Sequence, residues 1–498
     1  MVKPAQTLLL LLLVMALLGA FVWTFPSGEL VLSDSIKLHF VSLDEVLHPK
    51  DVKYADITNI VASDKWLDAD SALLGSAQDT AFTDSSLQIN DTFNYGKADI
   101  DALRNIKYKI QYPEGQENLL NDFFASLDMV NSQPAPIRIF HFGDSQIEGD
   151  RITGTIRNKM QHIFGGCGAG IIPLYDVADM RTSVRLKASS NWKKYAIYGN
   201  LHKGSRTNQY GMQGSVYRPL AQTGKDSTLQ TYKNAWVQLS KSYNGYPNTN
   251  RFQEIKVYYG NAKKNATVSI FSGRNIWKDT LSEGGFQSKK LSVDSFAKDI
   301  KIEFPADLGA DIYALSMDCK KGVAVDNVAM RGSSGTDFTR IDPAFFAQQL
   351  KAVNTKLLIL QFGVNVVPNP LNDYSFYEKS YYRNLQYLRD NLPGVSILVI
   401  GISDVAIKDG SHYVTSPNLT LIRDAQKKAA FKAGCAFWDL YEAMGGENSM
   451  PSWVNAKPSL AEKDFTHFNA NGAKIIGEMI YNALMREYIA YKNPDAQP

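Results

Sequence analysis

The sequence predicts an α/β fold: a doubly wound parallel sheet, with an all-β sandwich inserted into it and a membrane-spanning segment ahead of both. Three observations predict this. Short apolar runs alternate with helical patterns in the second half of the chain, strand-like runs interrupt the pattern in the middle, and a long uncharged apolar stretch comes first. The 498 residues suffice for roughly three folded units.

Residues 1–26 are predicted to form a membrane anchor. Leu8 to Phe25 are 18 residues without a charge, and at about 1.5 Å per residue they nearly span a hydrocarbon core of about 30 Å. The run ends in bulky side chains and no Ala-x-Ala follows, which favours an uncleaved anchor over a cleaved signal peptide. Lys3 predicts a cytoplasmic N-terminus, so the remaining chain is expected to be exported.

Residues 27–112 are predicted to form an arm or linker. A β-like run over Ser35–Leu47 is followed by a stretch rich in Ser, Asp and Ala over 63–101. This stretch has no sustained periodicity, which is typical of a tether.

The α/β domain is predicted to comprise residues 113–189 and 319–498. Apolar residues recur at helical spacing over 116–130, so an amphipathic helix begins the domain. Short apolar runs predict buried parallel strands at Ile137–Phe142, Leu357–Phe362, Val395–Ile400 and Ala436–Leu440. Helical patterns occur at Ile152–Phe164, Tyr377–Asn391, Leu421–Ala433 and Asn471–Tyr488.

Residues 190–318 are predicted to form the inserted sandwich. Aromatic and β-branched residues are common here, and Asn244-Gly245 and Gly284-Gly285 mark turns. The expected strands are Ala235–Leu239, Glu254–Tyr259, Thr267–Phe271, Ile300–Phe304 and Ile312–Met317.

Charge and cysteine content exclude several functional classes. With 53 basic and 50 acidic residues, the formal net charge is +3, which gives no basic surface for nucleic acid. Cys167, Cys319 and Cys435 are too far apart for zinc-ribbon or thioredoxin-like spacing. We expect all three to be unpaired and mostly buried, although one disulfide could form.

Two segments carry candidate catalytic side chains. Gly143-Asp144-Ser145 directly follows a predicted strand and precedes a helix, so Ser145 is expected at the carboxyl edge of the sheet, near backbone N–H groups that could stabilise an oxyanion. Asp464 lies three residues before His467 in a predicted loop. There the carboxylate could orient the imidazole towards a nucleophile. Each segment alone could equally be an ordinary helix cap.

Two further segments offer hydrogen-bond donors at strand ends. Asn365 follows the strand at 357–362 and offers a side-chain N–H, and Gly332 follows the apolar run Val323–Ala329 and offers an unobstructed backbone N–H. Either residue alone could simply form a turn.

Together, the order Ser, Gly, Asn, Asp-x-x-His resembles the SGNH (GDSL-type) hydrolase family. The resemblance implies that Ser145 is the nucleophile, His467 its base and Asp464 the orienting carboxylate. Gly332 and Asn365 would complete an oxyanion hole with the Ser145 backbone N–H. The resemblance implies no metal or organic cofactor.

The similarity extends over roughly Ile137–Gly170 and Val323–Tyr488. The phrases Phe142–Gln146 and Val325–Gly332 resemble exported peptidoglycan O-acetylesterases that carry a carbohydrate-binding-like β-domain between the first two motif blocks. Val366 stands where the family often has Asp, and Gln146 follows the serine where the family often has Leu. These departures leave the catalytic atoms in place but could alter the pocket.

The sequence-based hypothesis is a serine esterase that removes O-acetyl groups from an extracytoplasmic polysaccharide, most plausibly peptidoglycan, in the bacterial periplasm or cell envelope. Two alternatives stay open. One is O-acetyl transfer to a cell-envelope glycan, and the other is a non-catalytic, membrane-tethered glycan-binding protein. Comparing acetate release with formation of an acetylated sugar would separate the first two.

Several residues have a second interpretation. Gln146 and Asp404 are expected to bind substrate, and Asp404 could instead replace Asp464 as the orienting carboxylate. Cys167 could compete as a nucleophile, whereas His141 is expected to be structural. Aromatic residues of the insert could stack on sugar rings or form its core: Trp236, Tyr258, Tyr259 and Trp277.

Overall fold

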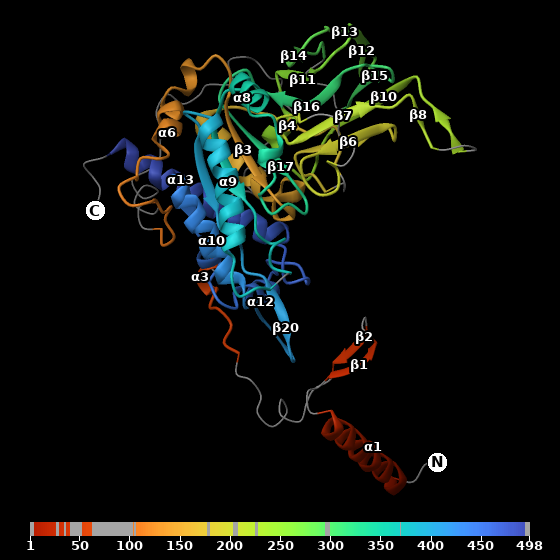
Figure 1. The fold of residues 1–498 in the computed structure, drawn as a ribbon, viewed down its shortest axis with the longest axis vertical. Helices are drawn as coiled ribbons and strands as arrows, with labels where there is room; N and C mark the ends of the chain where they lie inside the picture. The colour runs from red at the N-terminus through yellow and green to blue at the C-terminus, as the bar shows by residue number, and fades with distance from the viewer. Residues whose placement is uncertain are drawn as a thin grey trace.

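The computed structural model describes residues 4–25, 29–33, 36–39, 52–61, 103, 106–176, 180–202, 208–224, 228–293, 299–368 and 370–493. Figure 1 shows the α/β domain in the centre, the antiparallel strands at one end, and helix α1 (Pro4–Thr24) at the N-terminal end of the chain. The predicted α/β fold class is confirmed.

A parallel sheet of five strands forms the centre of the α/β domain. Its order is β17-β3-β18-β19-β22, and every neighbouring pair is parallel. The strands are β3 (Ile137–Gly143), β17 (Val323–Ala329), β18 (Thr355–Gln361), β19 (Ser396–Ile400) and β22 (Ala436–Trp438). The chain direction across the sheet reverses between β3 and β18, and open α/β sheets bind ligands at the carboxyl end of such a switch point.

Helices cover both faces of this sheet because alternate strand residues point to opposite sides. Ile139 and Ile359 lie in one hydrophobic core with α6 (Asn121–Asp128), α7 (Arg151–Phe164) and α13 (Ala470–Lys492). Phe140 and Leu358 lie in the other core with α8 (Pro343–Ala352), α9 (Ser375–Asn391) and α10 (Leu419–Lys432).

Two antiparallel sheets form the β-domain and enclose a core of its own. One has the order β13-β12-β15-β10-β5 and the other β14-β11-β16-β7-β6, with β4 paired to β16. The strands are β4 (Gly170–Ile172), β5 (Val184–Ala188), β6 (Trp192–Ala196), β7 (Ser215–Pro219), β10 (Asn234–Lys241), β11 (Glu254–Gly260), β12 (Ala266–Ser272), β13 (Asn275–Leu281), β14 (Gln287–Lys290), β15 (Asp299–Pro305) and β16 (Asp311–Asp318).

Strands β4 and β5 lie before residue 190, inside the range predicted for the α/β domain. The predicted boundary therefore misses the first strands of the sandwich: β4 has only three residues, and β5, although its apolar and charged residues alternate as in a strand, lies within the range given to the α/β domain. Short hairpins complete the strands of the described chain: β1 (Glu29–Ser33) with β2 (Ile36–His39), β8 (Gln222–Thr223) with β9 (Gln230–Thr231), and β20 (Ala406–Asp409) with β21 (His412–Thr415).

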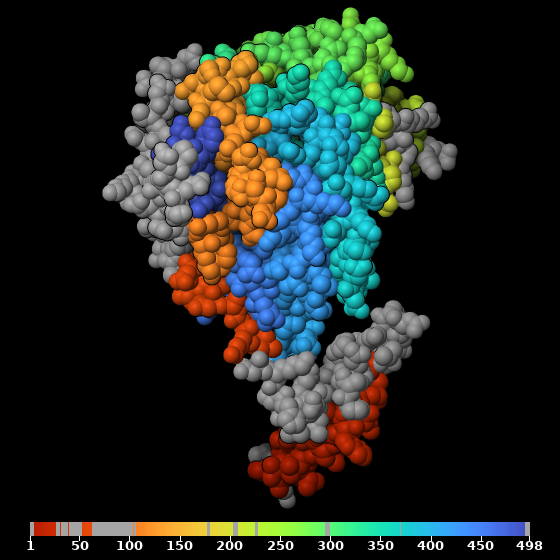
Figure 2. Space-filling view, turned by 60° about the vertical axis from the view of Figure 1, so that its left-hand side comes forward, coloured from red at the N-terminus to blue at the C-terminus, as the bar shows by residue number. Residues whose placement is uncertain are grey.

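Besides the core inside the sandwich, a second hydrophobic core joins the sandwich to the α/β domain. Tyr313 of β16 and Phe286 contact Phe345 of α8, with ring centroids 5.5 and 6.1 Å apart. Buried Arg138 of β3 adds ion pairs to Asp318 of β16 and Asp326 of β17. Figure 2 shows the green sandwich strands seated on the cyan and blue α/β domain. This interface fixes the β-domain beside the carboxyl edge of the parallel sheet.

The expectation of three unpaired cysteines is wrong. Cys167 and Cys319 form a disulfide, and only Cys435 is a free, buried thiol. The two bonded residues are 152 positions apart and lie just before β4 and just after β16. The disulfide therefore joins the two segments through which the chain enters and leaves the inserted β-domain.

The predicted arm is only partly described, since the polar stretch 63–101 lies outside the described residues. Of the predicted β-like run, Ile36–His39 forms a strand and 40–47 lies outside them. Residues 52–61 and 106–112 of the arm contact the α/β domain: Ile57 is buried, and Gln111 N–H donates to the Phe437 carbonyl at 2.7 Å. These parts are docked segments, not a free tether.

Candidate active site

The turn after β3 places Ser145 at the carboxyl edge of the sheet. Gly143 ends the strand, and a Cβ there would lie 2.7 Å from the carbonyl oxygen of Gln361 in neighbouring β18, so only glycine fits. Ser145 begins the 3₁₀ helix Ser145–Asp150, whose cap is Asp144. The first N–H groups of a helix have no partner within it, which leaves the Ser145 N–H available to a ligand.

Asp144 connects the turns that follow β3 and β18. Its carboxylate accepts hydrogen bonds from Gln146 N–H at 3.0 Å and from Gly363 N–H at 3.1 Å. Complete burial raises the pKa of Asp144 to about 6, although these hydrogen bonds oppose the shift. This side chain is a buried cross-link at the switch point.

His467 lies against Ser145, although the two residues are 322 positions apart in the chain. Ser145 Oγ is 2.8 Å from His467 Nε2, and His467 Nδ1 is 2.7 Å from Asp464 Oδ2. Hydrogen bonds from the His467 backbone and ring and from Thr466 N–H hold the pKa of Asp464 below its usual range, although partial burial opposes them. An ionised carboxylate only accepts, so Nδ1 carries the proton and Nε2 accepts from the serine hydroxyl.

The loop that carries His467 is held by the β20–β21 hairpin. Phe465 has a left-handed backbone with φ of 56°, and its ring stacks on Tyr413 of β21 with centroids 3.6 Å apart. Ala406 N–H of β20 donates to the Phe465 carbonyl at 3.0 Å. The hairpin thereby stabilises the tight turn between Asp464 and His467.

The side chains of Gln146, in the serine turn, and of Arg151, at the start of α7, also hold this loop. Gln146 donates to the Thr466 carbonyl at 2.7 Å and accepts from Phe468 N–H at 3.3 Å. Arg151 donates to the carbonyl oxygens of both Phe468 and Ser145. Sequence reasoning missed Arg151, whose only signal is its place at the start of the helix after the serine turn.

The predicted oxyanion donors lie at the same edge of the sheet. Gly332 follows β17 with φ of 83°, and a Cβ there would meet nothing within 4 Å, so the backbone conformation is what favours glycine. Asn365 follows β18 and donates one side-chain N–H to the Ser333 carbonyl at 2.9 Å, which leaves its second N–H for a ligand. Met330 N–H donates to the Gly143 carbonyl at 2.7 Å and joins the β17 turn to the serine turn.

Neither residue predicted to bind substrate is placed to do so. Gln146 is buried, and its side-chain amide forms hydrogen bonds with Ser403, Thr466 and Phe468. Asp404 is fully buried, and its carboxylate accepts from Thr415, Ser449 and Met450. These hydrogen bonds favour a role for both residues in holding loops together over contact with substrate.

The remaining candidates have structural partners. His141 is buried between Gln361 and Thr153, as expected, and burial lowers its pKa to about 4. Cys167 is in a disulfide and offers no thiol. Among the aromatic residues of the insert, Tyr258 and Tyr259 are buried in hydrophobic cores.

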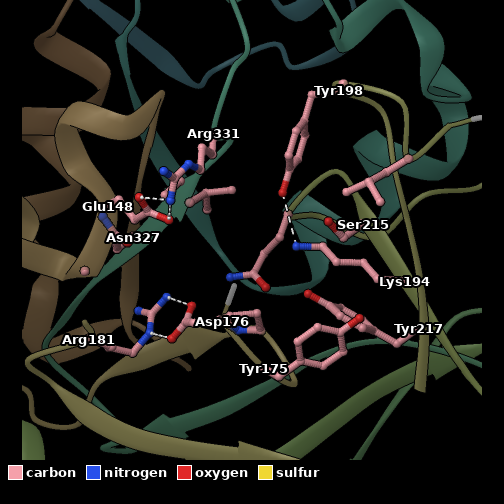
Figure 3. Close-up of a pocket in the computed structure, with 17 residues that line it drawn as sticks. Glu148, Tyr175, Asp176, Arg181, Lys194, Tyr198, Ser215, Tyr217, Asn327 and Arg331 are labelled. Carbon is pink, nitrogen blue, oxygen red and sulfur yellow. Dashed lines mark hydrogen bonds and ion pairs between the residues drawn. The ribbon is translucent and has the colours of Figure 1, made fainter. Parts of the chain in front are cut away.

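A cavity of about 180 Å³ adjoins the serine turn. Glu148 of this turn and Arg331 lie on one side of it, and Tyr175, Lys194 and Tyr217 of the β-domain lie on the other (Figure 3). The cavity therefore lies between the two domains, where Glu148 and Gly149 of the serine turn line it.

Comparisons with known proteins relate the chain to solved structures. No family model and no curated protein sequence matches it. A peptidoglycan O-acetylesterase, described as in action, aligns with a TM-score of 0.58 and 22% identity over 74% of this chain and 96% of that chain.

Two other solved structures align less well. An acetyl xylan esterase has 17% identity and a TM-score of 0.26 over 32% of this chain and 81% of its own. A putative GDSL-like lipase from Parabacteroides merdae has 18% identity and a TM-score of 0.23 over 33% and 74%. These two scores are too low to establish a shared fold. The chain shares its fold with the peptidoglycan O-acetylesterase over most of its length.

Proposed function

We propose that this chain is an SGNH-type serine esterase that removes O-acetyl groups from an extracytoplasmic polysaccharide, namely peptidoglycan. One observation carries the proposal. Ser145 Oγ, the His467 ring and the Asp464 carboxylate form a continuous hydrogen-bonded series with distances of 2.8 and 2.7 Å. This arrangement activates a serine hydroxyl as a nucleophile.

The reaction follows from the orientation of the imidazole. As Ser145 Oγ attacks the acetyl carbonyl, its proton moves to His467 Nε2, and Asp464 stabilises the imidazolium. The tetrahedral intermediate collapses when His467 returns that proton to the departing sugar oxygen, which leaves an acetyl group on Ser145. His467 then takes a proton from water as the water attacks the acetyl-enzyme. When the bond from the acetyl carbon to Ser145 Oγ breaks, acetate leaves and His467 returns the proton to Oγ.

The oxyanion of the intermediate is stabilised by three N–H groups at the carboxyl edge of the sheet. These are the backbone N–H groups of Ser145 and Gly332 and the side chain of Asn365. Loss of a single such donor typically costs about 10²- to 10³-fold in rate. The bond from Asn365 to the Ser333 carbonyl fixes the amide before substrate arrives, so little reorganisation is needed during the reaction.

The substrate class is supported by the fold that the chain shares with a peptidoglycan O-acetylesterase and by the cavity beside Ser145. The location is supported by α1, a helix of 21 residues whose most apolar 18-residue stretch has a mean hydropathy of 2.5 and none of whose residues is buried. We propose that α1 anchors the protein in the inner membrane and that the catalytic domain acts in the periplasm.

Substitution of the nucleophile tests the proposal. Ser145→Ala should lower kcat for an aryl acetate and for O-acetylated peptidoglycan by about 10⁴-fold or more, because the bond-forming oxygen is lost. Acetate release is measured, and circular dichroism confirms that the variant is folded.

Ser459→Ala is the matched control, since this serine lies outside the catalytic series and bonds only backbone carbonyls. It should leave kcat within a factor of about two. Full activity in Ser145→Ala would overturn the proposal.

A further inference from the structure

The serine turn reverses direction before helix α7 through two successive residues with a left-handed backbone. Gly149 has φ of 75° and Asp150 has φ of 66°, a conformation that is ordinary for glycine but strained for aspartate. Arg157 holds the buried Asp150 carboxylate by donating to its two oxygens at 2.6 and 3.0 Å. Strained residues of this kind persist where the surrounding structure fixes them, often at functional sites. Here the reversal directs the side chain of Arg151, the first residue of α7, back towards Ser145.

Arg151 donates hydrogen bonds to three backbone carbonyl oxygens. Its Nε donates to Glu148 at 2.9 Å and its Nη2 to Ser145 at 3.2 Å. Its Nη1 donates to Phe468, the residue directly after His467. The guanidinium is a rigid, planar group whose N–H donors have fixed directions. A single side chain therefore joins the carbonyl of the nucleophile to the residue that follows the base.

Arg151 also brings a positive charge to the loop that carries His467. Partial burial lowers the pKa of Arg151, and the carboxylates of Glu148, Glu462 and Asp464 oppose this shift. An arginine stays protonated in such surroundings. The charge therefore lies near the carboxylate that orients the base, and it favours the position of the loop in which Asp464 is close to Arg151.

We propose that Arg151 is a positioning residue that sets the distance between Ser145 Oγ and His467 Nε2. The inference rests on the proposed function, because it assigns Arg151 a part in activating the serine. Gln146 bonds the same loop and Ser403, whereas Arg151 bonds the loop and the nucleophile's own carbonyl. Loss of the guanidinium should let the two catalytic segments move relative to each other.

The surroundings of Arg151 allow the missing group to be supplied from solution. Arg151 is only partly buried, and it lines a cavity of about 180 Å³ between α7, α13 and residues 244–246 of the β-domain. An engineered cavity of about 150 Å³ binds benzene, which is larger than a guanidinium ion. Arg151→Ala would enlarge the cavity, so that a free guanidinium ion could occupy the place of the lost side chain.

Chemical rescue tests the inference. Full-length Arg151→Ala protein in detergent is assayed with an aryl acetate, with and without guanidinium chloride below its denaturing range. Misplacement by about 1 Å can cost about 10²-fold in rate, so we expect kcat to fall by about 10²-fold while KM changes little. Guanidinium should restore most of the lost kcat, whereas methylammonium chloride at the same concentration should not. Arg151→Lys keeps the charge but lacks the planar group, and it should stay impaired.

Arg423→Ala is the matched control, because Arg423 is another partly buried arginine, and its partners are the carboxylates of Asp424 and Glu442 on the surface of the α/β domain. It should leave kcat unchanged with and without guanidinium. Wild-type kcat in Arg151→Ala, or a loss of kcat that guanidinium does not reverse, would overturn the inference. Full activity in Ser145→Ala would overturn the proposed function itself, whereas an inactive Ser145→Ala beside a fully active Arg151→Ala would overturn only the role of Arg151.

Discussion

The serine turn (residues 143–150) and the base loop (residues 464–467) are built in opposite ways. The serine turn is almost wholly buried, and the sheet fixes it through Gly143 and Asp144. The base loop is half-exposed, with the side chain of Asp464 50% accessible, and no strand of the parallel sheet leads into it. Its position depends on the serine turn and the β20–β21 hairpin.

This difference shows where the precision of the site originates. A rigid turn presents the nucleophile, and hydrogen bonds from Gln146 of that turn and from Arg151, the first residue of α7, hold the loop that carries the base. The 2.8 Å contact between Ser145 and His467 is therefore set by contacts between the two segments. A substitution in the base loop should change only the orientation of the His467 ring, whereas one in the serine turn should displace both Ser145 and the base loop.

Among substitutions that spare the nucleophile, the largest effect is expected from Asp464→Asn. The amide cannot keep Nδ1 protonated as a carboxylate does, so a fraction of His467 would present the wrong tautomer to Ser145. A buried triad aspartate is worth about 10⁴-fold in kcat. Water can partly replace the exposed Asp464, so we expect a loss of about 10²- to 10³-fold, measured as kcat on an aryl acetate.

Glu462→Gln is the control for Asp464→Asn, because it removes a nearby charge without touching the imidazole, and it should cost less than about threefold. An Asp464→Asn enzyme with full kcat would mean that the base loop needs no orienting carboxylate.

A smaller loss is expected from Gln146→Ala. The substitution removes the bonds to Ser403, Thr466 and Phe468 but no reacting atom, so the base loop should shift relative to Ser145. Misplacement by about 1 Å can cost about 10²-fold, and we expect a loss of about 10- to 100-fold in kcat with little change in KM. A rise in KM with kcat unchanged would instead indicate that Gln146 contacts substrate.

Gln349→Ala separates this positioning effect from lost stability. Gln349 is also fully buried, and its side chain bonds the backbone at Tyr210, Met212 and Phe345, in the contact between the two domains. It should lower the unfolding temperature by a similar amount and leave kcat unchanged. Equal losses of kcat in both variants would contradict a positioning role for Gln146.

The comparison also explains what the sequence could predict. The apolar strands and the residues at their ends are local patterns, so the positions of Ser145, Gly332 and Asn365 after β3, β17 and β18 follow from sequence. The role of Gln146 depends on a segment more than 300 residues away, which no local pattern encodes. The Cys167–Cys319 pair is missed for the same reason, because its two residues are 152 positions apart. The β20–β21 hairpin is local, but its link to Phe465 of the base loop is not.

The pH dependence of stability should also differ between the serine turn and the base loop. Burial raises the pKa of Asp144 to about 6 from an ordinary value of 3.8, so the folded protein takes up this proton more readily than the unfolded chain. The stability that results is fully present below about pH 4 and is lost as pH rises through about 6. A difference of about two pKa units corresponds to about 3 kcal/mol in the free energy of unfolding. Asp144→Asn removes this pH dependence.

The measurement is the thermal midpoint of unfolding at pH 4.5 and 7.5. The wild-type midpoint minus that of Asp144→Asn should be larger at pH 4.5. Asp464→Asn supplies the contrast, because hydrogen bonds from His467 and Thr466 hold the pKa of Asp464 below its usual range. The stabilisation from Asp464 is present above about pH 4 and is lost only at lower pH. The wild-type midpoint minus that of Asp464→Asn should therefore be the same at pH 4.5 and 7.5. If the two variants showed the same pH dependence, the serine turn would not differ from the base loop in electrostatic environment, since burial dominates the first and hydrogen bonding the second.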